Sequence, residues 1–299
     1  MKKNKGMILA FTLPCALSLL IMFLYPVIRT VVMSFFKVES VTSAVSSWSF
    51  YGFGNYMKMF HSVSWQDSMW NMVRIWFFGG ILTLGIALLF AVILTSGIRG
   101  KKFFRAAIYL PNVVSAVALA TMWIQFVFNY DFGLINNIIR FFGGEKVKWL
   151  GQDLKFWSML GAFIFGAVGY YMLIFISGIE GIPGDLYEAA TIDGASKVAQ
   201  FFHITVPLLK GIIKTNITFW TISATTFFLW SMMFSPLGTE RSTTVPVIYL
   251  YDNVFGGSGA TTTVRDSGVG AATGVILALI IVAVYYISNH VIKDTDLEY

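Results

Sequence analysis

The sequence contains little charge and few residues that can form a disulfide or hold a metal. Only 12% of its 299 residues are Asp, Glu, Lys or Arg, about half the share usual in soluble domains. There is one cysteine, Cys15, and the three histidines, His61, His203 and His290, lie far apart in the sequence. An intrachain disulfide is therefore excluded, and neither a metal site nor a cofactor has support. The chain also lacks the GxxxxGK[ST] pattern of a nucleotide-binding P-loop.

Hydrophobic residues make up 57% of the sequence, and the mean hydropathy is +0.72. A soluble chain of this length cannot bury so much apolar surface, because the buried fraction grows only slowly with size. We therefore expect most of this surface to face a lipid bilayer. The net charge of +6 does not indicate nucleic acid, because the Lys and Arg residues cluster at the ends of apolar runs, as the positive-inside rule describes.

Six apolar stretches are long enough to cross a hydrocarbon core, which takes roughly 20 residues per helix. They cover residues 8–36, 69–96, 105–130, 157–181, 207–236 and 268–291. The first and fifth are long enough to predict tilt or a break, and Pro14 and Pro26 are candidate kink points in the first. The first stretch is too long for a signal peptide, so we expect an uncleaved helix. These features predict an all-α membrane protein with one domain over residues 1–299.

The distribution of basic residues predicts the orientation. Lys and Arg are densest in two short segments, with Lys2, Lys3 and Lys5 at the start and Arg99, Lys101, Lys102 and Arg105 between the second and third stretches. Such segments stay in the cytoplasm, so both termini are predicted to be cytoplasmic. The loops at 37–68, 131–156 and 237–267 would then lie outside the cell.

One polar segment, residues 182–207, interrupts this pattern on the predicted cytoplasmic side. Pro183 precedes a short predicted helix with Asp185 as its N-cap, and Glu188 follows at the spacing of a capping box. Gly194 is expected to end that helix, and a second short segment runs to Pro207. Composition alone leaves two interpretations open: a rigid elbow that another protein contacts closely, or an ordinary solvated loop.

The segment resembles the EAA motif of binding-protein-dependent ABC importer permeases, which reads EAA, three residues, G, nine residues, I, one residue, LP. The matching residues are Glu188, Ala189, Ala190, Gly194, Ile204 and Pro207. Val206 replaces the usual Leu, a conservative departure. The flanking residues are similar to those of the carbohydrate-uptake branch, typified by maltose-type and glycerol-phosphate-type permeases, and the resemblance extends from Pro26 to the last apolar stretch.

This resemblance implies a permease subunit of the bacterial cell membrane, not an enzyme, with six spans and a cytoplasmic coupling helix. The implied partners are a second permease subunit in a heterodimer, a dimer of ATPase subunits and an extracellular solute-binding protein that delivers a sugar or related solute. The residues implied in ATPase coupling are Asp185, Glu188, Ala189, Ala190, Asp193, Gly194 and Pro207.

Helical spacing suggests residues for the solute path. One face of the fourth stretch and one face of the fifth carry aromatic, small and hydroxyl residues: Phe163, Ala167, Tyr170, Trp220, Ser223 and Phe227. Aromatic faces stack on sugar rings, but ordinary helix packing produces the same pattern. Arg29 and Arg74, near the outer ends of the first two stretches, are expected to reach the outer interface; if either faced a cavity, it would indicate an anionic solute.

Two other classes of protein compete with this interpretation. A secondary transporter or channel not coupled to ATP predicts ionisable residues deep in the spans, and none lies near the middle of the last four. A membrane-embedded enzyme needs clustered carboxylates, a Ser/His pair or metal ligands, and the sequence supplies no such set. Neither class accounts for the spaced pattern from Glu188 to Pro207.

Overall fold

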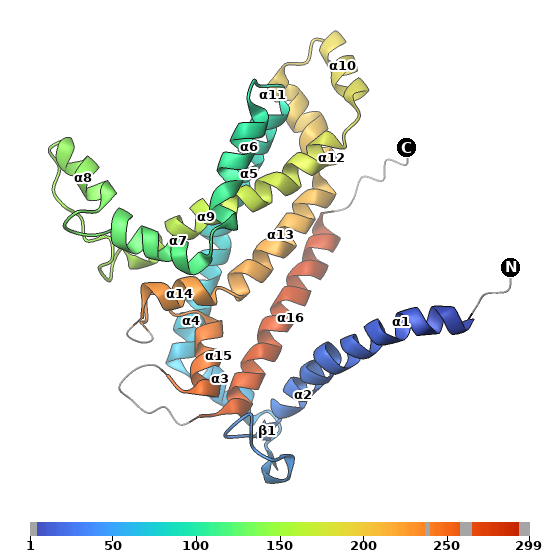
Figure 1. Cartoon of the computed structure of the whole chain (residues 1–299), viewed down its shortest axis with the longest axis vertical. Coiled ribbons are helices and arrows are strands. Elements are labelled where there is room, and N and C mark those ends of the chain that lie inside the picture. Colours follow the sequence, from blue (N-terminus) through green and yellow to red (C-terminus); the bar gives the residue numbers. More distant parts are fainter. Residues whose placement is uncertain (1–4, 237–239, 258–264, 293–299) are drawn as a thin grey trace. The chain divides into compact units, whose positions relative to one another are not determined.

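A computed structural model describes residues 5–236, 240–257 and 265–292, and most of these residues are helical (Figure 1). Lys2, Lys3 and parts of the 237–267 loop lie outside the described residues. The chain divides into two compact units, one formed by residues 1–66 and 249–278 and the other by residues 67–248 and 279–299.

The first unit contains the N-terminal helix, a two-stranded antiparallel ribbon and the start of the C-terminal helix. The elements that begin in it are α1 (Lys5–Leu19), a π-helical turn (Leu20–Leu24), α2 (Tyr25–Met33), β1 (Phe36–Lys37), a 3-10 turn (Val45–Ser47), β2 (Ser49–Phe50), α3 (Gly54–Phe60), α4 (Val63–Arg74) and α16 (Ser267–Val291).

The first apolar span, Ala10–Met33, is irregular next to one of its two prolines. The helix continues through Pro14, whereas the π-helical turn Leu20–Leu24 ends two residues before Pro26. Proline has no N–H to donate to the preceding turn, so a local change in hydrogen bonding beside Pro26 follows from its chemistry. No residue of the span's most apolar window is buried within the chain.

A buried amide joins the parts of the first unit. The Asn55 side chain, 1% exposed, donates from Nδ2 to the carbonyl oxygens of Ser34 (2.9 Å) and Phe36 (2.8 Å). Gly268, near the start of α16, lies so close that a Cβ there would be 2.5 Å from the Phe36 oxygen. A residue with a side chain at 268 would therefore separate α16 from the ribbon.

The second unit contains the remaining helices. The elements that begin in it are a π-helical turn (Ile75–Gly79), α5 (Gly80–Thr95), α6 (Lys101–Val113), α7 (Ala116–Met122), a π-helical turn (Trp123–Val127), α8 (Leu134–Phe141), α9 (Lys155–Glu180), α10 (Gly184–Ile192), α11 (Lys197–Gln200), a π-helical turn (Phe201–Thr205), α12 (Val206–Leu208), α13 (Lys210–Thr225), α14 (Phe228–Phe234) and α15 (Pro246–Phe255).

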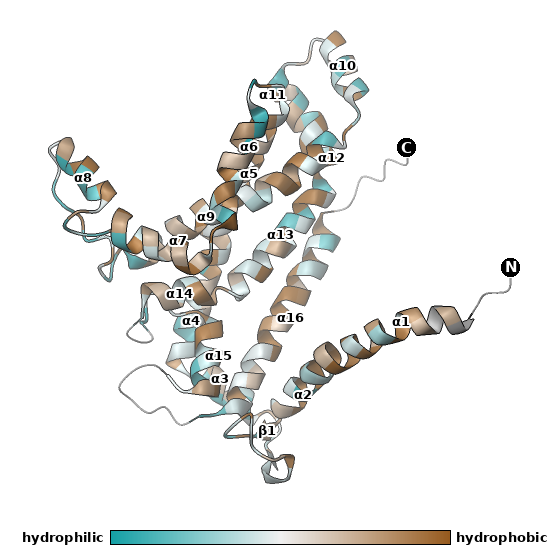
Figure 2. Ribbon diagram, in the orientation of Figure 1, coloured by the Kyte–Doolittle hydropathy of each residue, from teal (hydrophilic) through white to brown (hydrophobic). Residues whose placement is uncertain are grey.

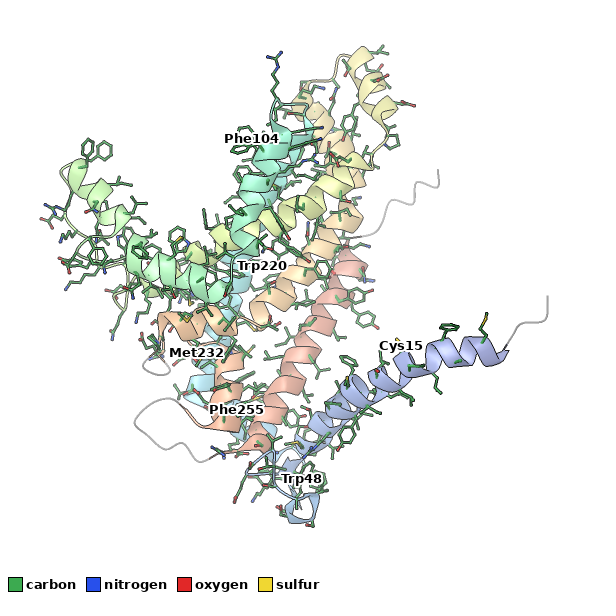
Figure 3. The ribbon with its side chains drawn as sticks, in the orientation of Figure 1. Cys15, Trp48, Phe104, Trp220, Met232 and Phe255 are labelled. Atoms are coloured by element: carbon green, nitrogen blue, oxygen red, sulfur yellow. The ribbon has the colours of Figure 1, made fainter. Side chains whose placement is uncertain are left out.

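Helix α9 is central to this unit and packs against both α5 and α6. Small residues permit the close approach, which is the usual way that helices associate in membranes. Ala87 and Ala91 of α5 are fully buried, and a Cβ at Gly169 of α9 would lie 2.5 Å from the backbone oxygen of Ile108. Trp220 of α13, 2% exposed, lies in the middle of the unit (Figure 3).

In the ranges that the structure describes, four helices are long and apolar enough to span a membrane: Ala10–Met33, Val63–Thr95, Lys155–Glu180 and Ser267–Val291. Hydrophobic residues cover most of α16, whereas α10 mixes hydrophilic and hydrophobic residues (Figure 2). The predicted stretches 157–181 and 268–291 agree closely with α9 and α16.

The other two predicted spans are bent pairs of helices. The predicted span 105–130 is not one continuous helix, because α6 and α7 meet at 97°. Pro111 removes an N–H from the end of α6, and Val114 and Ser115 then adopt extended backbone angles. The predicted break in the long fifth stretch is present as a 42° bend between α13 and α14. Each bent pair is long and apolar enough to cross a membrane if its two halves form one span.

Candidate coupling loop and solute cavity

The polar segment 182–207 folds as an elbow of short helices between α9 and α13. Helix α10 begins at Gly184, and Pro183, with an extended backbone, stands in the N-cap position. The prediction of Asp185 as N-cap is therefore wrong. Asp185 instead lies in the first turn, where its negative charge interacts favourably with the helix dipole.

Gly194 follows the end of α10, as the sequence predicts. Its φ is +79°, a conformation that costs a residue with a Cβ about 1–2 kcal/mol. The Gly194 N–H donates to Thr191 O (3.1 Å) and the Ala195 N–H to Ala190 O (2.8 Å). This pair of bonds is a Schellman motif, so the turn direction after α10 is fixed by the backbone.

Side-chain hydrogen bonds hold the two arms of the elbow together. Gln200, 3% exposed, donates from Nε2 to Thr191 Oγ1 at 2.9 Å, and the hydroxyls of Tyr187 and Thr205 are 2.9 Å apart. The Ser196 Oγ caps α11 by accepting from the Ala199 N–H. Sequence reasoning missed Tyr187, Gln200 and Thr205, since a polar residue in a polar loop gives no signal of burial.

The residues predicted for coupling divide into an outer and an inner set. Asp185, Glu188, Ala189, Asp193 and Gly194 are exposed, whereas Ala190 and Pro207 are half-buried. Within the described part of the chain, Glu188 takes part in no ion pair. Ile192, at the end of α10, is 86% exposed. The outward side of α10 thus presents a free carboxylate beside small and apolar residues.

A hollow of about 750 Å³ lies on the inner side of the elbow. Its walls include Thr95 at the end of α5, Glu180 at the end of α9, and Tyr187 and Lys197 of the elbow. Glu180 forms an ion pair with Arg105 of α6, so the ends of α6 and α9 are joined beside the elbow.

Four of the six residues predicted for the solute path line one cavity of about 210 Å³: Phe163, Ala167, Tyr170 and Ser223. Tyr171, which spacing did not identify, also lines it, and its hydroxyl is 2.9 Å from Ser223 Oγ. The break between α6 and α7 forms another part of the wall, through Pro111, Asn112, Val114 and Ala116.

The other two predicted residues lie behind this wall. The Trp220 indole donates from Nε1 to the Trp76 carbonyl at 2.8 Å, and its ring fills the space that Gly79 and Gly80 leave open. Phe227 packs edge-on against Phe163, with ring centroids 4.8 Å apart. Both side chains support the cavity without lining it.

The two arginines predicted to reach the outer interface each contact aromatic rings. Arg29 donates to the Val41 carbonyl oxygen at 3.0 Å and lies 5.8 Å from the centroid of the Trp48 ring. The Arg74 guanidinium lies 3.9 Å from the centroid of the Phe156 ring. Among the described residues, no three His, Cys, Asp or Glu side chains are grouped so that they could hold a metal ion.

Comparisons with known proteins give the family. The family described as "Binding-protein-dependent transport system inner membrane component" matches residues 82–296. The sulfoquinovosyl glycerol transport system permease protein SmoG of Agrobacterium fabrum is 30% identical, over 95% of this chain and 89% of that protein. The arabinooligosaccharides transport system permease protein AraP of Bacillus subtilis is 27% identical, over 93% of this chain and 86% of that protein.

The fold agrees with a solved structure. A chain of a bacterial ABC transporter involved in the import of the acidic polysaccharide alginate has a TM-score of 0.81 and 19% sequence identity, covering 97% of this chain and 96% of that chain. At this identity the likeness concerns the fold alone. The predicted resemblance to importer permeases, and the prediction of a transport subunit instead of an enzyme, are confirmed by the family match and the related permeases. The chain belongs to the family of inner membrane components of binding-protein-dependent transport systems.

Proposed function

We propose that this chain forms one half of the translocation path of an ATP-driven importer for a sugar, oligosaccharide or related solute. The observation that carries the proposal is the elbow 182–207, a rigid structure that presents α10 outward between two long helices. Membership of the transport family supports an importer. The names of the related permeases, which concern a sulfoquinovosyl glycerol and arabinooligosaccharides, support a carbohydrate.

In this proposal the protein is one permease domain with six spans, each bent pair counting as one span, and with both termini in the cytoplasm. The elbow and the Lys and Arg residues at 99–105 then lie on the cytoplasmic side. The ion pair between Arg105 and Glu180 supports that placement, because it joins the basic segment to the end of α9 from which the elbow starts.

Helix α10 would act as the coupling helix, seated in a cleft of an ATPase subunit. Glu188 offers an unpaired charge to a basic residue of the ATPase, and Ala189 permits close contact because its side chain is small. The hydrogen bonds of Tyr187 and Gln200 make the elbow stiff. A displacement of α10 during ATP hydrolysis would therefore pass to α9 and α13 instead of being absorbed in the loop.

The cavity at Tyr170 and Ser223 would be this subunit's part of the solute path. Its volume of about 210 Å³ is below the roughly 300–1,000 Å³ of sites that enclose a small molecule. A second permease subunit would complete the site. An extracellular binding protein would deliver the solute to it. Hydroxyls beside aromatic rings, as at Ser223, Tyr171 and Phe163, suit a ligand with polar edges and apolar faces.

The test uses the full transporter, made by co-expression with its ATPase, second permease and binding protein. Reversing the exposed charge in Glu188→Arg is expected to lower ATP hydrolysis stimulated by the binding protein by about tenfold or more, because like charges facing each other at an interface cost several kcal/mol. Glu145→Arg, a reversal at another exposed glutamate, is the control. Equal activity of the two variants and the wild type would refute the role of α10.

A further inference from the structure

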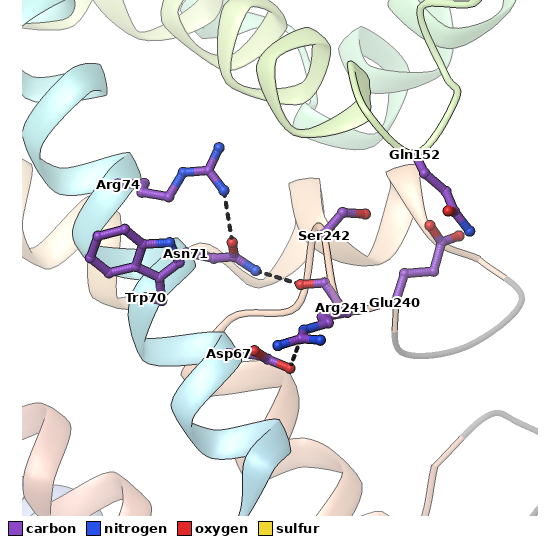
Figure 4. Close-up of a pocket in the computed structure, with 8 residues that line it drawn as sticks. All are labelled: Asp67, Trp70, Asn71, Arg74, Gln152, Glu240, Arg241 and Ser242. Carbon is purple, nitrogen blue, oxygen red and sulfur yellow. Dashed lines mark hydrogen bonds and ion pairs between the residues drawn. The ribbon is translucent and has the colours of Figure 1, made fainter.

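A second hollow in the same unit lies at the other end of the helices that border the elbow. Its volume is about 620 Å³, and its walls are formed by Asp67, Trp70, Asn71, Arg74, Gln152, Glu240, Arg241 and Ser242 (Figure 4). We call it the outer pocket. Arg74 and Thr95 belong to one helical span, Val63–Thr95, and a rise of 1.5 Å per residue separates them by about 30 Å. That distance is about the thickness of a hydrocarbon core, so the outer pocket lies at the membrane face opposite the elbow.

The charges of the outer pocket are paired except for one. Asp67 Oδ2 lies 2.9 Å from the Nε of Arg241, and both carboxylate oxygens of Glu240 accept from Lys155 Nζ, at 2.7 and 2.8 Å. Arg74 has no carboxylate within ion-pair distance in the described ranges. Both acids of the pocket are therefore paired, Asp67 with Arg241 and Glu240 with Lys155, which does not line the pocket. In this part of the chain, Arg74 is the charge that is left without a partner.

The guanidinium of Arg74 is held in place from one side and open on another. It lies over Phe156 at 3.9 Å and near Trp157 at 5.2 Å, measured to the ring centroids. In the part of the chain that the structure describes, its one hydrogen bond is a long one, from Nη1 to Asn71 Oδ1 at 3.5 Å. Figure 4 shows the other terminal nitrogen pointing away from Asn71, and the residue is only half-buried.

Asn71 is itself fixed, which fixes the direction of Arg74. Its side chain is 3% exposed, and its Nδ2 donates to the carbonyl oxygens of Arg241 (2.9 Å) and Thr244 (3.0 Å). The amide oxygen is thereby turned towards Arg74. A guanidinium whose position is set by stacking and by one acceptor keeps its remaining donors in the fork geometry that binds a carboxylate or phosphate through two hydrogen bonds.

The rest of the outer pocket suits a sugar ring. Its volume lies within the range of sites that enclose a small molecule. Trp70, next to Asn71 in α4, lines the pocket and is 63% exposed, so much of its indole is accessible for stacking on the apolar face of a pyranose. The Gln152 amide and the Ser242 hydroxyl offer donors and acceptors for ring hydroxyls.

We infer that the outer pocket binds the anionic group of an acidic saccharide, a carboxylate, sulfonate or phosphate, through Arg74, with the sugar ring against Trp70. The inference rests on the proposed function and narrows its solute class. The anion would pair with Arg74, the one charged group of the pocket that has no partner of opposite charge among the described residues. A neutral saccharide would leave the Arg74 fork without an acceptor, so the pocket would discriminate in favour of acidic solutes before they reach the interior.

The test measures direct binding to the full transporter in phospholipid nanodiscs, without the binding protein, by equilibrium dialysis. The probes are radiolabelled digalacturonate, its neutral bis(methyl ester), and inorganic sulfate. The wild type is expected to bind the acid about 10- to 100-fold more tightly than the ester, because hydrogen bonds to charged groups are strong. Sulfate is expected to bind weakly, since it has no ring for Trp70. Equal affinity for acid and ester, no binding of the acid, or sulfate binding as tight as the acid would each overturn the inference.

Variants identify the residue responsible. Arg74→Gln is expected to remove the preference for the acid while keeping the affinity for the ester, which also shows that the pocket is intact. Arg140→Gln, at an exposed arginine of α8, should keep the full preference. Trp70→Ala should lower the affinity for the acid and the affinity for the ester by similar factors. If Arg74→Gln still binds the acid more tightly than the ester, the inference is overturned. If that variant does not assemble, the comparison of acid and ester binding by the wild type decides the inference alone.

Two other acceptors for Arg74 are separated by the same experiment. If the acid binds in lipid-free detergent but not in nanodiscs, a lipid phosphate occupies the site, and the inference is wrong. It is equally wrong if the acid does not bind and Arg74→Gln instead weakens docking of the binding protein, because the partner is then a protein carboxylate. If the binding protein stimulates ATP hydrolysis but the transporter binds acid and ester equally, the proposed function stands and only the inference about the outer pocket fails. Absence of that stimulated hydrolysis in the wild type contradicts the proposed function itself.

Discussion

Replacement of Gly194 by alanine isolates the contribution of backbone geometry to the elbow. Gly194 has a φ of +79° and a Cβ placed there meets no atom within 4 Å. Alanine at this position therefore introduces no clash, and its whole effect comes from the left-handed backbone conformation. That conformation costs about 1–2 kcal/mol for a residue with a Cβ.

This cost acts on the two hydrogen bonds that end α10, from Gly194 to Thr191 and from Ala195 to Ala190. A loss of 1–2 kcal/mol changes an opening equilibrium by about 5- to 30-fold. Hydrogen exchange of the segment 184–200 is therefore expected to be faster by about that factor in Gly194→Ala, measured by mass spectrometry on the assembled transporter. Uptake per ATP hydrolysed should fall as well, because a looser elbow transmits less of the displacement of α10.

Gly184→Ala is the matched control. A Cβ at Gly184 also meets no atom within 4 Å, but its φ is not positive, and alanine favours a helix more than glycine does. This variant should exchange at the wild-type rate or more slowly. Wild-type exchange in Gly194→Ala, or equal acceleration in both variants, would refute the argument that backbone conformation at Gly194 holds the elbow.

Two further predictions concern packing and ionisation. Gly169→Val places a Cβ 2.5 Å from the Ile108 oxygen and is expected to destabilise the protein by about 1–3 kcal/mol. Gly161→Val is the control, because a Cβ there meets no atom within 4 Å, and it should leave the stability unchanged. Equal melting temperatures of the two variants in detergent would contradict the packing of α9 on α6. The hydrogen bond from Lys58 to Asp266 raises the pKa of Lys58 above its ordinary 10.5, so the stabilisation from this pair is present at neutral pH and is lost as the pH rises through the raised value. The difference in melting temperature between wild type and Lys58→Met should therefore shrink on going from pH 8 into the range above 10.5, and a difference that grows with pH would show that the cause is wrong.

Hydropathy predicted the helices whose ends are marked by a change from apolar to polar residues. Helices α9 and α16 lie within two residues of the predicted stretches for this reason. The 97° break at Val114 and Ser115 was not predictable in the same way, because apolar residues stand on both sides of it and no polar segment marks it. Pro111 was the available signal, although a proline within a membrane helix often leaves the helix unbroken, as Pro14 does in α1.

The candidate sites were predictable to different depths. The turn after α10 could be predicted because Gly194 encodes local geometry, whereas the choice of an elbow over a solvated loop came from the resemblance to the EAA motif. The solute path could be predicted only partly, since helical spacing tells which residues share a face and not what that face contacts. Trp220 shares a face with Ser223 but fills the space over Gly79. The unpaired charge of Arg74 depends on which acids meet Arg241 and Lys155, and those pairings join segments far apart in the sequence.

The break between α6 and α7 has a consequence for water. Backbone N–H and C=O groups outside a helix cannot remain unpaired in hydrocarbon and are tolerated at membrane depth only where protein or a hydrated cavity covers them. Val114 and Ala116 border the cavity of about 210 Å³, so the non-helical backbone at the break lies beside a hollow that water can enter. In the proposed solute path, a polar solute at this cavity would exchange part of its hydration shell for the backbone at the break. The bend would then spare the solute from entering a hydrocarbon phase.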